Sequence, residues 1–168
     1  MAHIDRGKRA LGGAIKRTRP SHAATVLVER GLVRGRTLDY GCGYGLDAAT
    51  FGWEAYDPYY CPIDPVGPYD TIVCLLVLNA LSRANRARVI ERVRGLLAAD
   101  GRAYLAVARD LPITGKLGMQ HSLQNYVVLT LPTVFEDQRI AIYVLDSQAV
   151  VADKTRDYLS RRDRRRLR

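Results

Sequence analysis

The chain has 168 residues and carries 26 Lys and Arg against 17 Asp and Glu, a formal net charge of +9, with 48% hydrophobic residues. This describes one globular domain that can bury a core without disulfides or a structural metal. The three cysteines form no C-x-x-C pair and no cluster with histidine, and their odd number suits a reducing compartment. The longest apolar run, residues 72–78, is too short to cross a bilayer. We therefore expect a cytoplasmic protein that binds neither a metal nor a membrane.

Charge is distributed unevenly along the chain. Residues 1–36 contain nine Lys and Arg against two acids, and residues 153–168 contain eight against three, so the middle of the chain is mildly acidic. Basic ends attract a polyanion by releasing its counterions, which makes nucleic acid the natural candidate partner. The alternative is that both ends are solvated tails, because arginine-rich termini are commonly of that kind.

The first half of the chain alternates between expected helices and strands. Residues 1–20 mix Gly, Lys and Arg without periodicity and predict an irregular basic arm. Ser21 is a suitable N-cap for a helix that stops at Gly31. Short strands are expected at residues 37–40, 53–56 and 69–76. The last of these is apolar on both faces, as in a strand covered by helices on both sides.

The second half adds a long helix and further strands. A helical period predicts a helix over residues 82–99 that ends at Asp100-Gly101, followed by a buried strand at residues 102–108. Two apolar segments, residues 126–131 and 140–145, are expected to pair as a hairpin. The pattern predicts an α/β fold with an open, mostly parallel sheet and a reversed C-terminal strand.

These elements divide the chain into a basic arm (1–20), a folded domain (21–147) and a basic tail (148–168). The tail is either a charged helix or frayed, since it lacks a sustained apolar stripe. Residues 114–120 place two glycines beside Lys116. They are interpreted as a mobile flap that contacts substrate or phosphate, with an ordinary exposed loop as the alternative.

Glycines concentrate directly after the first strand, in the motif Asp39-Tyr40-Gly41-Cys42-Gly43-Tyr44-Gly45. Glycine lets the backbone turn sharply and approach a ligand at the carboxyl end of the sheet, where open α/β folds bind ligands. The spacing differs from the G-x-G-x-x-G of dinucleotide folds. An acid just before the glycines repels phosphate, so the loop favours a cationic or amine-bearing ligand.

This D-x-G-x-G-x-G pattern resembles the first motif of class I S-adenosylmethionine-dependent methyltransferases. The resemblance implies that the cofactor S-adenosyl-L-methionine is bound by Asp39, Tyr40, Gly41, Gly43 and Gly45. Asp57 follows the second strand, where that family places an acid that accepts hydrogen bonds from the ribose hydroxyls. Residues 69–73 resemble the family's fourth strand, and Leu76 follows where a cofactor-facing turn is found.

The chain departs from this family in two places. Residues 58–68 are too few for the family's third strand and its helix, so we expect a Rossmann-like methyltransferase fold trimmed after the second strand. Adenine must then be held in another way, with Tyr59, Tyr60 or Leu76 as candidates. DNA amino-methyltransferases also carry a D/N-P-P-Y/F box after the fourth strand, where this chain has residues 76–79, Leu-Val-Leu-Asn.

Catalysis in such an enzyme depends largely on alignment, because a sulfonium is already a good leaving group. Asn79 is predicted to align an acceptor amine, and Asp110 lies just beyond a strand, near where a base would reach. His22 and His121 are alternative bases. The residues predicted to contact the substrate are Arg17, Arg19, His22 and Lys116.

A finer resemblance rests on the run at residues 16–22 together with the glycine loop, Asp57-Pro58 and residues 77–79. Together they look like the small methyltransferase domains associated with DNA phosphorothioation, which favours a nucleic-acid partner. We therefore expect an S-adenosylmethionine-dependent methyltransferase that acts on DNA or RNA. Two alternatives stay open: a small-molecule methyltransferase with solvated basic ends, and a non-catalytic module that docks on nucleic acid or an acidic partner.

Overall fold

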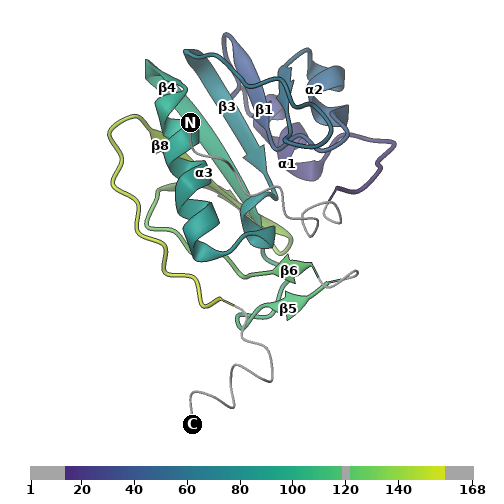
Figure 1. The fold of residues 1–168 in the computed structure, drawn as a ribbon, viewed down its shortest axis with the longest axis vertical. Coiled ribbons are helices and arrows are strands. Elements are labelled where there is room, and N and C mark those ends of the chain that lie inside the picture. Colours follow the sequence, from purple (N-terminus) through teal and green to yellow (C-terminus); the bar gives the residue numbers. More distant parts are fainter. Residues whose placement is uncertain (1–13, 119–121, 158–168) are drawn as a thin grey trace.

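The computed structural model describes residues 14–118 and 122–157 of the chain. Its main body is a six-stranded sheet with helices on both faces (Figure 1). The strands of this sheet are β1 (Thr37–Tyr40), β2 (Glu54–Tyr56), β3 (Tyr69–Leu75), β4 (Leu97–Ala108), β7 (Thr133–Glu136) and β8 (Ile140–Asp146). The helices are α1 (His22–Glu29), α2 (Leu46–Phe51), the 3-10 helix η2 (Leu78–Ala80) and α3 (Arg83–Gly95). A separate two-stranded sheet consists of β5 (Lys116–Leu117) and β6 (Leu123–Gln124).

The strand order of the main sheet is β2-β1-β3-β4-β8-β7. The strands β1 to β4 run parallel, whereas β8 is antiparallel to both β4 and β7. This confirms the predicted mostly parallel sheet with a reversed C-terminal strand. The parallel strands end at a common edge, which we call the carboxyl edge. β8 begins at that edge, because Ile140 pairs with Ala108 at the end of β4.

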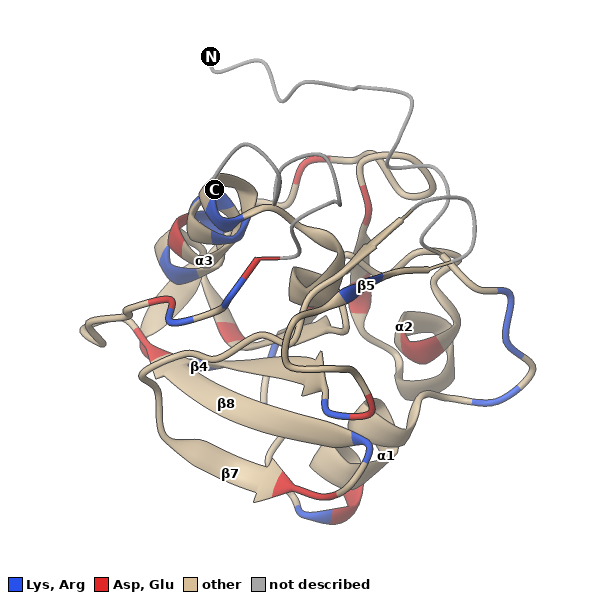
Figure 2. Cartoon of the chain, turned by 90° about the horizontal axis from the view of Figure 1, so that it is seen from below, with Lys and Arg blue, Asp and Glu red and all other residues tan. Residues whose placement is uncertain are grey.

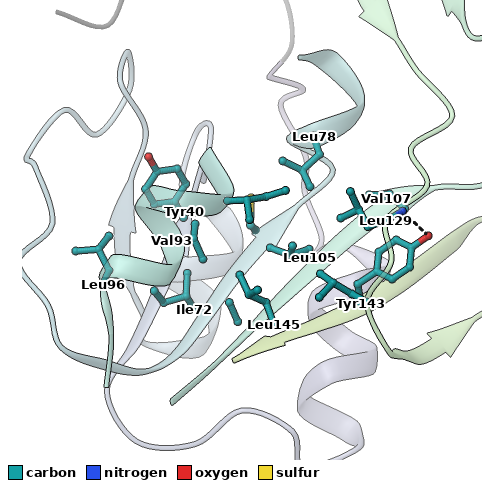
Figure 3. Close-up of a cluster of buried hydrophobic side chains, with 14 of the residues drawn as sticks. Tyr40, Ile72, Leu78, Val93, Leu96, Leu105, Val107, Leu129, Tyr143 and Leu145 are labelled. Atoms are coloured by element: carbon teal, nitrogen blue, oxygen red, sulfur yellow. Dashed lines mark hydrogen bonds between the residues drawn. The ribbon is translucent and has the colours of Figure 1, made fainter. Parts of the chain in front are cut away.

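Different helices cover the two faces of the sheet. Side chains alternate along β3, so Ile72 and Cys74 enter one layer while Val73 enters the other. The first layer contains Ile90 and Val93 of α3, and Figure 3 shows the Val93 side chain near that of Ile72 on β3. The second layer contains α1. Both faces of the central strands are therefore buried, as their apolar runs predict.

The sheet is trimmed after β2, as the sequence predicts. Residues 57–68 connect β2 to β3 and contain neither a helix nor a ladder of strand pairs, only one bridge between Asp57 and Cys61. In the described sheet β2 is therefore an edge strand, and it pairs with β1 alone. The Asp57 turn consequently lies beside the strand that carries the glycine loop.

The helix α3 is shorter than predicted. It ends at Gly95, and β4 begins already at Leu97, which pairs with Tyr69 of β3. Gly101 therefore lies inside β4 instead of ending the helix. A Cβ at Gly101 would lie 2.6 Å from the Tyr69 carbonyl oxygen, so the two backbones approach closely here. This strand pairing overrides the helical period of residues 96–99.

The predicted hairpin has the wrong first strand. On the side away from β4, the antiparallel partner of β8 is β7, which falls in the predicted connection, and not residues 126–131. That segment lies beside residues 152–155, where the Thr130 N–H donates to the Ala152 carbonyl oxygen at 3.0 Å. The apolar side chains that misled the prediction are buried all the same: Val127, Leu129 and Leu131. The alternate side chains of residues 126–131 are thus buried although this segment does not pair with a strand of the main sheet.

Residues 148–157 do not form a helix, which was one of the two predicted alternatives for the tail. They run beside α3 toward β5, as the yellow segment of Figure 1 shows, and end at the last described residue. Arg94 Nη2 donates to the Ala149 carbonyl oxygen at 2.7 Å, and Arg83 Nη1 donates to the Asp153 carbonyl oxygen at 2.7 Å. The first part of the predicted tail is thus packed against the fold.

Candidate functional site

The glycine loop between β1 and α2 folds back onto the end of β2. The backbone N–H groups of Gly41 and Cys42 donate to the Tyr56 carbonyl oxygen at 2.7 and 3.0 Å. Gly41, Gly43 and Gly45 have φ values of 84°, 56° and 76°, in the left-handed region that favours glycine. The tight path of the loop at the carboxyl edge therefore depends on glycine at these positions.

Gly41 is the most restricted of the three. A Cβ there would lie 2.4 Å from Cγ2 of Val77. We expect Gly41→Ala to lower the free energy of unfolding by about 2 kcal/mol and to weaken ligand binding, because the clash adds to the backbone strain. Gly52→Ala is the matched control, since Gly52 has a φ of 72° but open space around its Cβ position. Equal losses in the two variants on chemical denaturation would show that Val77 moves aside and that only φ matters.

Asp39 lies on β1, just before the glycine loop, and is 2% exposed. The Ala48 N–H of α2 donates a hydrogen bond to its carboxyl group. Burial, reinforced by the negative charge of Asp47, raises the pKa of Asp39 to about 7. Within residues 14–118 and 122–157, no Lys or Arg forms an ion pair with this carboxylate. A cationic ligand would therefore stabilise its ionised form.

Asp57 links the glycine loop to the turn after β2. Its Oδ2 accepts a hydrogen bond from the Gly43 N–H at 3.1 Å. Its Oδ1 accepts from the N–H groups of Tyr59 and Tyr60 at 2.9 and 3.1 Å. A carboxylate has about four lone-pair sites, so these bonds leave room on Oδ2 for a ligand hydroxyl. The carboxylate is thus held firmly while it keeps a free acceptor site.

Exposed apolar and aromatic groups lie near these two acids. Leu76 follows β3, is 44% exposed and has a φ of 62°. Such a value is strained for a leucine, and strain of this kind clusters at functional sites. Tyr44 of the glycine loop is 47% exposed, and its ring centroid lies 4.3 Å from that of Tyr60 in the Asp57 turn. These side chains offer apolar surface to a ligand ring.

Tyr40 differs from the rest of the motif because its side chain faces the core. It is 6% exposed, and its ring centroid lies 4.9 Å from that of Tyr56. Burial raises the pKa of the Tyr40 phenol above its ordinary value. A ligand contact at this position would therefore come from the backbone.

The two predicted catalytic residues have different surroundings. Asn79, in η2, is 2% exposed; its Nδ2 donates to the Asn125 carbonyl oxygen at 2.7 Å, and its Oδ1 accepts from the Ala108 N–H at 2.9 Å. The side chain thus ties the turn after β3 to the end of β4 and to the residue that follows β6. Oδ1 keeps a second lone pair, but at 2% exposure an acceptor could reach it only if neighbouring residues moved aside. Asp110 is exposed just after β4, at the carboxyl edge.

Two of the predicted substrate contacts are paired with acids. Arg17 forms two hydrogen bonds with Asp47, at 3.1 and 3.0 Å. His22 Nε2 lies 2.8 Å from Oδ2 of Asp137, in the turn between β7 and β8. This bond with His22 lowers the pKa of Asp137 to about 2. The structure therefore uses both side chains to connect the start of the domain to other parts of the carboxyl edge.

The other predicted contacts are exposed. Arg19 lies in the arm before α1, and Lys116 lies on β5. The predicted flap contains β5, which pairs with β6 through Lys116 and Gln124. His121, the alternative base, is outside the described residues.

Sequence reasoning missed two residues at this edge. Asp47 is 2% exposed and lies in the first turn of α2. An acid just after the glycine motif was the signal that could have identified it. Arg109, directly after β4, donates from Nε to Glu136 Oε1 at 2.9 Å and from Nη2 to the Tyr143 hydroxyl at 2.7 Å. No sequence pattern predicts the Arg109 contacts, because they join strands through the tertiary fold.

The site combines a buried carboxylate without an ion pair among the described residues, a second carboxylate with spare acceptor capacity, and a loop whose three glycines have positive φ values. Within the described part of the chain, no three His, Cys, Asp or Glu side chains gather as metal ligands. No described helix has both the length and the apolar character needed to span a membrane. The arrangement suits an organic ligand that carries a cation and hydroxyl groups.

Solved structures with this architecture include S-adenosylmethionine-dependent methyltransferases. A 1,6-didemethyltoxoflavin-N1-methyltransferase from Burkholderia thailandensis, solved with its substrate and S-adenosylhomocysteine, aligns with a TM-score of 0.51 and 17% identity over 73% of this chain and 75% of that one. A magnesium protoporphyrin IX methyltransferase from Synechocystis aligns with a TM-score of 0.43 and 18% identity over 73% and 74%. No protein-family model matches the sequence, and no curated protein is similar to it. The first similarity shows a Rossmann-like methyltransferase fold.

Proposed function

We propose that this chain is an S-adenosylmethionine-dependent methyltransferase whose acceptor is a nucleic acid. The observation that carries the proposal is Asp39, a carboxyl group 2% exposed beside a glycine loop, which forms no ion pair with a Lys or Arg of the described residues. Burying a carboxylate without a partner is costly, so the site is completed by a ligand that brings a positive charge. S-adenosylmethionine carries an ammonium group that meets this need.

The residues of the site fit this cofactor. Asp39 would hold the ammonium group, Gly41, Gly43 and Gly45 would let the backbone approach it, and Asp57 would accept a ribose hydroxyl through Oδ2. Leu76 would contact it from the end of β3. When bound, S-adenosylmethionine supplies a methyl group attached to a good leaving group. These assignments explain why an acid precedes the loop where phosphate-binding folds have none.

The chain contributes to methyl transfer chiefly by positioning. Asn79 fixes the turn after β3 through its two hydrogen bonds, which would hold the acceptor side of the site rigid. Asp110 is exposed at the end of β4, and we assign it as the base for an acceptor that must lose a proton. Both roles are part of the proposal.

Charge supports a nucleic-acid acceptor. The chain has a net charge of +9, and Arg19 and Lys116 are exposed on two different segments, where we propose that they contact the acceptor together with His22. Figure 2 shows basic residues on the loop before α1, on β5 and on α3, with acidic residues among them. The resemblance to methyltransferase domains associated with DNA phosphorothioation points in the same direction.

A small-molecule acceptor is the second candidate. It is favoured by the Burkholderia thailandensis enzyme, which was solved with 1,6-didemethyltoxoflavin. The mixed signs of charge in Figure 2 also suit a protein whose basic residues are merely solvated. A module that binds nucleic acid without catalysis would be recognised by the absence of methyl transfer to any acceptor.

Two measurements test the proposal. Calorimetry should detect binding of S-adenosylmethionine and of S-adenosylhomocysteine, and transfer of a labelled methyl group to DNA or RNA should follow. Absence of cofactor binding would refute the enzyme in either form. Cofactor binding together with labelling of small acceptors, but not of DNA or RNA, would move the assignment to the second candidate.

The arginine-rich C-terminus offers a more specific test. Deleting residues 158–168, which carry six arginines and one acid, should flatten the salt dependence of nucleic-acid binding and leave cofactor affinity unchanged. The cut is placed there because residues 149–157 pack against α3. Nucleic-acid affinity should be compared by shift assays at several salt concentrations. An unchanged slope would remove the tail from the acceptor site.

A further inference from the structure

The described part of the basic arm, residues 14–20, lies directly on the glycine loop. A Cβ at Gly43 would lie 3.1 Å from the Cβ of Ala14, and the Lys16 ammonium lies 5.4 Å from the centroid of the Tyr44 ring. Tyr44 in turn packs on Tyr60 of the Asp57 turn. One end of the described chain therefore forms a wall beside both elements of the proposed cofactor site.

A partly buried ion pair anchors this arm. The guanidinium of Arg17 binds both carboxylate oxygens of Asp47, at 3.1 and 3.0 Å, and the Ser21 N–H donates to Oδ1 at 2.7 Å. Asp47 is 2% exposed, whereas the side chain of Arg17 is 33% exposed. A two-point arginine–carboxylate contact of this kind is both strong and directional. The Ser21 hydroxyl also caps α1, so the arm is fixed where it enters the domain.

Both partners of this ion pair act on Asp39: the charge of Asp47 raises the pKa of its carboxyl group, and the charge of Arg17 lowers it. Asp39 and Asp47 are both buried, and Arg17 is the cation that acts on this pair of carboxylates. The other ionisable groups near Asp39 are the carboxylate of Asp57 and the thiols of Cys42 and Cys74. Burial raises the pKa of both thiols, so they remain neutral.

We propose that Arg17 is a positioning residue of the cofactor site, which by pairing with Asp47 holds the arm on the glycine loop and leaves Asp39 as the carboxylate for a cationic ligand. The inference rests on the proposed function only in taking that ligand to be S-adenosylmethionine or its demethylated product. It gives Arg17 a role at the cofactor in place of the substrate contact predicted from the sequence. It also assigns a role to Asp47, which sequence reasoning missed.

The charge arrangement predicts opposite effects of removing either partner. Asp47→Asn removes the negative charge that opposes ionisation of Asp39, so Asp39 should ionise at lower pH. Arg17→Met removes the compensating cation, so Asp39 should ionise at higher pH and affinity at pH 7 should fall about tenfold or more. An arm that serves only to stabilise the fold would give two unstable variants with an unchanged pH profile.

The test is calorimetric titration of the full chain with S-adenosylhomocysteine between pH 5.5 and pH 8.5, in buffers of different ionisation enthalpy. In the wild type, affinity should rise through about pH 7, with proton release on binding below that pH. The midpoint should move down in Asp47→Asn and up in Arg17→Met, and the double variant should lie between them. Arg88→Met, an exposed arginine on α3, is the matched control and should behave as the wild type.

The outcomes separate the two proposals. A wild-type chain that binds no S-adenosylhomocysteine at any pH contradicts the proposed function itself. A wild-type chain that binds, with the same midpoint in Asp47→Asn and Arg17→Met, overturns the role of Arg17 alone. If Arg17→Met does not fold, Asp47→Asn decides, because it keeps the shape of the side chain and its midpoint must still move down.

Discussion

Asp39→Asn should make the ligand-free protein more stable at pH 8 and at the same time abolish binding of S-adenosylmethionine. The carboxyl group is 2% exposed, and its pKa is raised from 3.8 to about 7 in the folded state. A raised pKa means that the folded protein prefers the neutral acid. Asn supplies a neutral side chain of the same shape, so the cost of burying a charge disappears together with the charge that would bind an ammonium group.

The sign and the pH range follow from this difference in pKa. Below about pH 4, Asp39 is protonated in both states, and Asp and Asn should behave alike. As the pH rises from about 4 to 7, the unfolded chain gives up the proton while the folded protein keeps it, so stability falls progressively. Above about pH 7 the full penalty is present, and it amounts to about 4 kcal/mol for a shift of this size. The advantage of Asn should therefore grow over this window and then remain constant.

Chemical denaturation of both proteins at pH 4, 6 and 8, without ligand, measures the effect. Asp100→Asn is the control, because its side chain is 85% exposed and should show little pH-dependent change. A variant that is less stable than the wild type at pH 8 would mean that a cation compensates Asp39 in the folded protein. Retained cofactor affinity in Asp39→Asn would contradict its assignment to the ammonium group.

Arg86→Met should lower the free energy of unfolding by about 3 kcal/mol at pH 7. The Arg86 side chain is fully buried, its Nε donates to Asp153 Oδ2 at 2.7 Å, and its Nη1 donates to the Leu81 carbonyl oxygen at 2.6 Å. Its Nη2 forms a further ion pair with Asp157. Removing the cation leaves two carboxylates facing each other, one of them largely buried, and frees the segment that they anchor.

The loss should depend on pH. Burial by itself raises the pKa of Asp153, but hydrogen bonds from Thr155 and Arg86 outweigh it and leave the pKa below its ordinary value. An acid with a lowered pKa adds stability above its unfolded pKa and loses that contribution as the pH falls. The difference between Arg86→Met and the wild type should therefore shrink below about pH 4.

Hydrogen exchange locates the effect. Residues 149–157 should lose protection in Arg86→Met, since this arginine holds their end against α3. Arg88→Met on the same helix is exposed and should change neither stability nor exchange. A loss below about 1 kcal/mol, or unchanged protection of residues 149–157, would show that the segment is held by its backbone contacts with residues 128–130 instead.

The central strands of the sheet and the turn that follows the first of them could be predicted from the sequence. Continuous apolar runs predicted strands buried on both faces, and the glycines after the first strand predicted a sharp turn of the backbone at the carboxyl edge. The few residues between Asp57 and Tyr69 predicted the trimmed sheet. These predictions were possible because hydrophobic periodicity and the backbone freedom of glycine are local properties, which depend only on residues adjacent in the sequence.

Tertiary structure decided the rest. Residues 126–131 have the alternating pattern of a strand, but it is β7 that pairs with β8 on the side away from β4. Residues 126–131 instead form backbone hydrogen bonds with residues 152–155. The partner of Arg17 is Asp47, thirty residues away along the chain, and its predicted contact with a substrate stays a prediction. Which partner a charged or apolar side chain meets depends on the packing of distant segments. Burial and charge compensation in the folded protein decide which partner is favoured, so a local sequence pattern cannot predict it.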